Sequence, residues 1–232
     1  MTRVENFVKD AGIDLDIHIR TKMVRYWSYI KTAAIRIGGD ILEVEGSIPG
    51  EDGLAKRHYY INFEYRGELD TLGGFPVVIN PRNNVYTIDL DSAYAGVKIE
   101  IKTFKEFVSV KIIGATNESF GNAVGIIGDF NTGKTLARDG STVLDDFNDL
   151  GLEWQVLPSD GKLFHEVAQP QFPELCYLPE DPRGERIRRL AESDITEEAA
   201  EEACAGLKDE LDRKDCIYDI LATQDMDMVG AY

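Results

Sequence analysis

Short segments typical of β-strands fill the first 130 residues, and this pattern constrains the fold more than any other feature of the sequence. Residues 13–20 alternate apolar and polar side chains with a period of two, as in a strand that buries one face. Further candidate strands occupy residues 24–37, 41–44, 59–65, 76–79, 85–90, 97–104, 107–113 and 123–127. Because no amphipathic helix of ten or more residues interrupts them, the sequence predicts a mainly β fold, an antiparallel β-sandwich or meander.

Turn-forming residues dominate the next part of the chain. Residues 131–160 are rich in glycine, aspartate and asparagine, and the segment at 154–156 predicts one last strand that returns to the core. Four prolines then punctuate residues 161–190, which we interpret as a linker. The β domain is therefore predicted to span residues 1–160.

The C-terminal part, residues 191–232, predicts an acidic α-helical hairpin. Ser193, Asp194 or Thr196 can cap a first helix, and the glutamates that follow suit the positive end of its dipole. A second helix is expected over residues 208–222. Its inward-facing residues are predicted to be Leu211, Ile217, Ile220 and Leu221.

The overall charge limits the choice of partners. The chain carries a formal net charge of −17 at pH 7, and a protein this acidic repels nucleic acid and anionic membranes. No apolar run is long enough to cross a bilayer, so no membrane insertion is predicted. The N-terminus also lacks the apolar core of a signal peptide. We therefore expect an intracellular protein or a chain that begins after processing or truncation.

Three cysteines, Cys176, Cys204 and Cys216, leave at least one thiol without a partner inside the chain. Two interpretations stay open. In the first, all three are buried thiols of a cytosolic protein. In the second, Cys204 and Cys216 form a disulfide, and the partner of Cys176 lies outside this chain.

Residues 128–135, with the sequence GDFNTGKT, match the phosphate-loop pattern G-x-x-x-x-G-K-[ST]. Such a loop follows a parallel strand and binds phosphate through N–H groups that converge at the start of a helix. Here Asp139-Gly140 would end any helix after about one turn, and Asp129 would repel phosphate. The upstream strands also predict antiparallel sheets. A nucleotide-binding protein that uses this loop is therefore the alternative interpretation.

The same region offers oxygen ligands for a hard cation. Ca²⁺ prefers roughly six to eight oxygens, which carboxylates, amides and carbonyl groups in turns can supply. The segment is not an EF-hand, because Lys134 and Gly140 occupy its sixth and twelfth positions. Aspartate and asparagine also form turns without any metal, so composition alone leaves calcium binding open. The candidate calcium ligands are Asp129, Asn131, Asp139, Asp145 and Asp146.

Three stretches resemble the end of a von Willebrand factor type D domain, namely residues 124–131, 138–140 and 147–156. The family typically shows a G-[LV]-x-G-[ND]-[FY]-[ND] turn, a P-D-G turn and a closing F-G-x-x-W-x-V. The resemblance covers about residues 13–157. The helical tail resembles the segment appended to von Willebrand D-like proteins of algae and other protists.

This resemblance implies a β-sandwich module of an extracellular adhesive, gel-forming or matrix protein, often with Ca²⁺ at the first turn. By position, Asp129 and Asn131 match that turn. The chain departs from the family in three respects. It lacks cysteines around the turn, it has Gly133-Lys134 in place of an acidic pair, and it lacks the opening G-D-P-H stretch. We therefore expect a divergent and truncated domain.

No catalytic site stands out in the sequence. The three histidines, His18, His58 and His165, show no metal-ligand spacing, and His18 is expected to be exposed on the polar face of a strand. The chain is accordingly predicted not to be an enzyme. The predicted function is a structural or adhesive module, secreted or at the cell surface, that Ca²⁺ stabilises. Its predicted partners are other protein modules or copies of itself.

Overall fold

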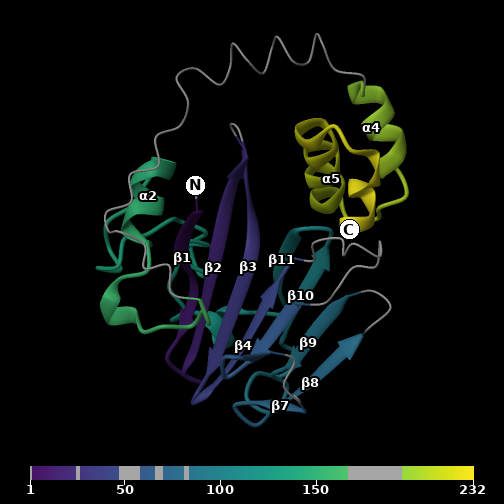
Figure 1. Cartoon of the computed structure of the whole chain (residues 1–232). Coiled ribbons are helices and arrows are strands. Elements are labelled where there is room, and N and C mark those ends of the chain that lie inside the picture. Colours follow the sequence, from purple (N-terminus) through teal and green to yellow (C-terminus); the bar gives the residue numbers. More distant parts are fainter. Residues whose placement is uncertain (1, 25–26, 47–57, 66–69, 81–83, 167–194) are drawn as a thin grey trace. The chain divides into compact units, whose positions relative to one another are not determined.

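A computed structural model describes residues 2–24, 27–46, 58–65, 70–80, 84–166 and 195–232. The chain divides into two compact units (Figure 1). The β unit comprises the described parts of residues 1–22 and 28–176, and the helical unit those of residues 23–27 and 177–232. In the described part of the chain, no helix is both long and apolar enough to cross a membrane.

The β unit contains two antiparallel sheets, which confirms the mainly β prediction. The strands of the first sheet, in spatial order, are β1 (Thr2–Asp10), β2 (Leu15–Val24), β3 (Trp27–Ile37), β4 (Asp40–Glu45), β5 (His58–Ile61) and β6 (Glu64–Tyr65). Those of the second sheet are β11 (Phe107–Ile113), β10 (Lys98–Phe104), β9 (Val85–Asp89), β8 (Phe75–Asn80) and β7 (Thr71–Leu72). Each sheet is thus a meander, in which strands that follow one another in sequence are paired.

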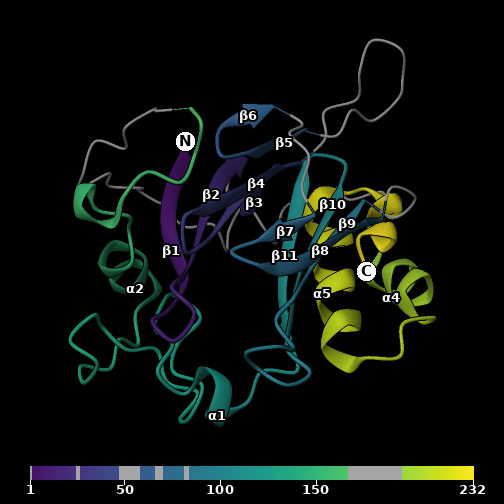
Figure 2. The ribbon, with the colours of Figure 1, turned by 90° about the horizontal axis from the view of Figure 1, so that it is seen from below.

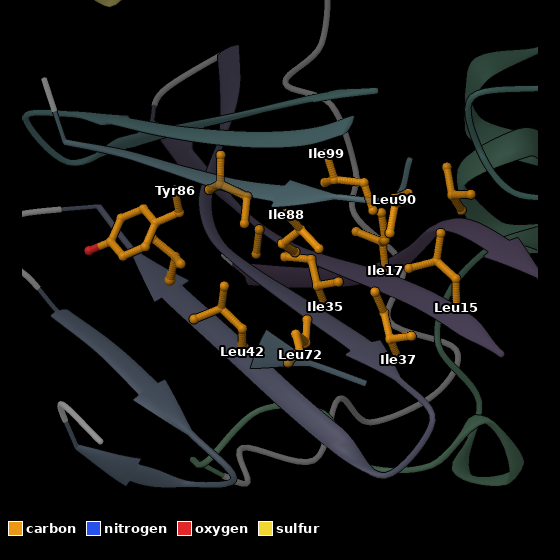
Figure 3. Packing of buried hydrophobic residues seen from close by; sticks show 14 of the residues in the cluster. Leu15, Ile17, Ile35, Ile37, Leu42, Leu72, Tyr86, Ile88, Leu90 and Ile99 are labelled. Carbon is orange, nitrogen blue, oxygen red and sulfur yellow. The ribbon is translucent and has the colours of Figure 1, made fainter. Parts of the chain in front are cut away.

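One apolar layer joins the inner faces of the two sheets (Figure 3). Side chains of a strand alternate between its faces, so every second residue of β2, β3 and β4 points into this layer. Ile17, Ile35 and Leu42 come from the first sheet and Ile88 and Ile99 from the second, and all five are 0% exposed. Because burial of each side chain contributes about 1.5–3 kcal/mol, this layer holds the two sheets together.

The outer face of the first sheet is covered as well. Leu163 and Phe164 form a second apolar cluster with Ala34 of β3 and Ile41 of β4. Residues 161–166, which we predicted to belong to a linker, therefore pack on the β unit. This unit extends past the predicted boundary at residue 160.

The burial of His18 overturns the expectation for this residue. The side chain does lie on the outer face of β2, but it is only 1% exposed, so the prediction of an exposed histidine is wrong. The prediction assumed that an outer face meets water. The remainder of the predicted linker, including Cys176, lies outside the described residues.

Two predicted strands are wrong. Residues 123–127 form turns, because Gly125 adopts a φ of 152°, and only Val124 makes an isolated bridge to Lys9. Residues 154–156 follow helix α2 (Phe147–Glu153), and only Gln155 of the three forms a β-bridge. Conversely, β1 was not predicted. Two short helices complete the β unit, α1 (Asn117–Phe120) and the 3-10 turn η1 (Pro158–Asp160).

The helical unit confirms the predicted hairpin. Its elements are α4 (Glu197–Cys204), α5 (Glu210–Thr223) and the 3-10 helix η2 (Met226–Ala231). Thr196 caps α4 by accepting the N–H of Ala199, and Asp209 caps α5. The assignment of Leu211 to the inner face is wrong, since it is 70% exposed.

A disulfide joins the two helices of this unit. Cys204 of α4 and Cys216 of α5 are bonded and fully buried, which supports the second interpretation of the cysteines. The bond closes a short loop, and native disulfides of this kind typically contribute about 2–4 kcal/mol. Ala200, Ile220 and Met228 are also buried in the unit. The disulfide therefore stabilises a helical unit that buries few apolar side chains.

Candidate functional site

The turn-rich segment between α1 and α2 contains a pocket of about 210 Å³. Both views place α2 beside β1, at the edge of the six-stranded sheet (Figures 1 and 2). The pocket is small and is lined largely by backbone and short side chains. Its lining residues are Gly121, Asn122, Ala123, Val124, Gly125, Gly128, Asp129, Leu136, Ala137, Gly140 and Trp154.

Glycine is required where this segment approaches β1. A Cβ on Gly125 would lie 2.2 Å from the carbonyl oxygen of Phe7, and its φ of 152° is rarely adopted by other residues. Two backbone hydrogen bonds hold the approach, since the N–H of Lys9 donates to the carbonyl of Val124 and the reverse bond is also present. The pocket wall is thus fixed to the first strand.

The turn at Asp129 and Asn131 is closed by its own side chains. The Asp129 carboxylate accepts hydrogen bonds from the N–H and the hydroxyl of Thr132, both at 2.7 Å. These donors hold the pKa of Asp129 below its usual range. The Asn131 amide donates to the carbonyl of Gly121 at 2.9 Å. Asp129 and Asn131 therefore both have structural partners in the chain.

The other predicted ligands serve different turns. Asp139 accepts hydrogen bonds from the N–H groups of Ser141 and Thr142 and from the Thr142 hydroxyl, which place its pKa well below its usual range. Asp146 caps α2 by accepting two N–H groups, which also lowers its pKa. Asp145 is exposed beside it.

The structure does not gather the five predicted calcium ligands into one set. Of the five, Asp129 alone lines the pocket. Among the described residues, no group of three or more His, Cys, Asp or Glu side chains is placed to hold a metal ion. The arrangement therefore does not fit a calcium cage built from these side chains, and calcium binding stays a prediction.

The elements that a phosphate loop needs are not found around residues 128–135. A turn, rather than a strand, precedes Gly128, and the first helix after Thr135 is α2, which begins at Phe147. Several N–H groups of the loop also donate within it. Those of Asp129 and Gly133, for example, donate to the carbonyls of Lys134 and Asp129 at 2.9 and 2.8 Å. These donors do not converge on a common point.

Arg138 holds this region together, and the sequence reasoning did not identify it. Its Nε and one terminal nitrogen donate to the carbonyls of Glu153 and Gln155, both at 2.8 Å. The guanidinium also lies 3.4 Å from the carboxylate of Asp160 and 5.1 Å from the Trp154 ring centroid. A planar group with five donors is suited to such a junction. The sequence feature that could have pointed to Arg138 was its position directly before the Asp139-Gly140 turn.

A second polar contact lies under the cover of the first sheet. Glu43 is 1% exposed, and both of its oxygens lie 3.0 Å from Nδ1 of His165, whose backbone N–H donates to Glu43 at 2.7 Å. Burial raises the pKa of Glu43, and the contacts with His165 oppose this shift. The His165 ring stacks on Tyr60 with centroids 3.5 Å apart. This histidine, which we predicted to lie in a linker, therefore anchors the chain to the sheet.

We predict that Arg138→Ala lowers the free energy of unfolding by about 2 kcal/mol, the scale of hydrogen bonds made by a charged donor. Arg138→Lys should recover part of this loss, because an ammonium group cannot reach both carbonyls and Asp160 together. Urea unfolding followed by tryptophan fluorescence measures both changes. Lys134→Ala, at an exposed site in the same segment, is the control and should stay near the wild type. Equal stability of Arg138→Ala and Lys134→Ala would contradict the role of Arg138.

We also predict a specific acid sensitivity from Asp139. Its folded-state pKa is lower than the ordinary value of 3.8, so its stabilising contribution is present above pH 3.8 and is lost as the pH falls further. Asp139→Asn removes this titration, and the free energy of unfolding of the variant should fall less steeply than that of the wild type below pH 3.8. Urea unfolding at a series of acidic pH values measures the slopes. An unchanged slope in Asp139→Asn would refute the prediction.

Comparison with known proteins adds no family assignment to this geometry. No protein-family model matches the chain, and no curated protein matches it. Membership of the von Willebrand factor type D family therefore stays a prediction that rests on the motifs at residues 124–156.

Proposed function

We propose that this chain is a non-catalytic structural module of an extracellular or cell-surface assembly, similar to a von Willebrand factor type D domain. The observation that carries the proposal is the buried disulfide between Cys204 and Cys216. Disulfides form and persist in oxidising compartments and are rare in the cytosol. A disulfide in the core of a small helical unit therefore favours a secreted or surface protein.

The use of polar groups in the β unit supports a structural role. The carboxylates of Asp129, Asp139 and Asp146 accept hydrogen bonds within their own turns. His165 is engaged with Glu43 beneath the cover of the sheet. These carboxylates and His165 are thus committed to holding loops in place, as expected of a rigid module that binds other modules or copies of itself.

The redox state of the chain in its cells tests the proposal. Thiols are alkylated at the moment of lysis, and the chain is then analysed by mass spectrometry in the cytosolic and the surface or secreted fractions. We expect the Cys204–Cys216 peptides to be joined and the chain to be in the surface or secreted fraction. A chain found in the cytosol with both cysteines alkylated would contradict the proposal.

Calcium binding at the Asp129 turn is a separate prediction, and the module does not depend on it. On this prediction, millimolar Ca²⁺ raises the melting temperature relative to EDTA. Asp129→Asn removes the increase, while Glu201→Gln, at an exposed acidic residue outside the candidate ligands, retains it. Melting is followed by circular dichroism of the full chain. An equal melting temperature in Ca²⁺ and EDTA would contradict calcium binding and leave the structural role untouched.

The same melting assay tests the alternative interpretation, a nucleotide-binding protein. Mg-ATP is expected to leave the melting temperature unchanged, because residues 128–135 neither follow a strand nor begin a helix. An increase with Mg-ATP that Lys134→Ala abolishes would instead favour a nucleotide-binding protein.

A further inference from the structure

An amine and a carboxyl group from distant parts of the sequence, those of Lys9 and Asp160, are in contact in the β unit. Lys9 lies on β1 and Asp160 ends η1, 151 residues later, yet Nζ lies 2.9 Å from Oδ1 of Asp160. The Asp160 side chain is 9% exposed and that of Lys9 is 27% exposed. The contact joins the first strand to the segment that covers the outer face of the first sheet.

The backbone of Lys9 and the carboxylate of Asp160 are both held in place by their neighbours. Lys9 is paired with Asp16 in the β1–β2 register, and its backbone forms two hydrogen bonds with Val124 on the other side. Asp160 is fixed by the N–H of Leu157, which donates to Oδ2 at 2.7 Å, and by Arg138. Two groups positioned in this way lose little conformational entropy when they react. Such positioning corresponds to a very high effective concentration of one group at the other.

A second buried carboxylate faces the same amine. Oδ2 of Asp16 lies 3.8 Å from Nζ of Lys9, and the Asp16 side chain is 6% exposed. Arg36 lies 3.6 Å from the same carboxylate, and Nε2 of His18 lies 3.3 Å from its other oxygen. The 3.8 Å separation is longer than a hydrogen bond, so a proton passes between Lys9 and Asp16 through one bridging water molecule or after a small movement of the side chains.

We propose that Lys9 and Asp160 form an intramolecular isopeptide bond, an amide between Nζ of Lys9 and Cγ of Asp160. Asp16 takes a proton from the Lys9 ammonium, and the neutral amine adds to Cγ. Negative charge then develops on Oδ2, where the N–H of Leu157 and the Arg138 guanidinium stabilise it. Asp16 relays the protons lost from Nζ to Oδ1. The Cγ–Oδ1 bond breaks and Oδ1 leaves as water.

The step is balanced without any co-reactant. An ammonium group and a carboxylate give one amide and one water molecule, nothing is oxidised or reduced, and Asp16 ends in its starting form. The bond would tie the first strand covalently to η1. This inference is independent of the proposed function, since it depends on the local geometry alone.

The mass of the full chain tests the proposal directly. The protein is denatured and its disulfide reduced before the intact mass is measured, so that only an isopeptide or another covalent change is seen. We expect a mass lower than that of the sequence by one water molecule, and a branched proteolytic peptide that contains Lys9 and Asp160. A wild-type mass equal to that of the sequence would overturn the proposal and leave an ion pair only.

Variants assign the bond to these residues. Lys9→Arg and Asp160→Ala should both restore the full sequence mass, and Asp16→Asn should slow or prevent the loss of water. Lys22→Arg is the matched control, because Lys22 forms an exposed ion pair with Glu106 at 3.1 Å, and it should keep the mass deficit. Circular dichroism checks that each variant folds. A deficit that persists in folded Lys9→Arg would overturn the assignment.

Discussion

The apolar layer between the two sheets determines the other features of the β unit. Its inward residues on β2 and β4, such as Ile17 and Leu42, require the residues between them to point outward. The outward residues include Asp16, His18 and Glu43, all nearly fully buried by other parts of the chain. The packing of the core therefore forces polar groups into a second, covered layer. Each of these groups needs a partner there.

The cover of the first sheet supplies partners for Glu43 of β4 and for Lys9 of β1. His165 meets Glu43, and Asp160 meets Lys9 while Arg138 holds Asp160 from the other side. Breaking one member of a buried pair leaves the other charge without compensation, which costs more than the pair itself contributes. Leu163 and Phe164 also pack on Ala34 and Ile41 of the sheet. Charge pairing and apolar packing therefore together select the position of this segment on the sheet.

Local patterns predicted most of the strands because one face of each meets the core. β1 was not predicted because its register with β2 shifts between Asn6 and Val8, which interrupts the alternation of inward and outward side chains. Residues 123–127 have strand-like composition, but the close approach of Gly125 to β1 requires a turn. The partners of Glu43 could not be predicted, because His165 is 122 residues away and nothing local marks the pairing. Long-range polar contacts of this kind follow from the assembled fold.

Hydrogen-bonding groups of the GDFNTGKT segment already have partners within the segment itself. Its backbone donors at Asp129 and Gly133 close the turn on the carbonyls of Lys134 and Asp129, and the Asp129 side chain accepts from Thr132. A phosphate would have to recruit N–H groups that already have acceptors. A cation would have to compete with the donors on Asp129. Either ligand would replace hydrogen bonds that are already made, so the turn holds its shape without a ligand. The binding free energy would come only from the difference between the new bonds and those they replace.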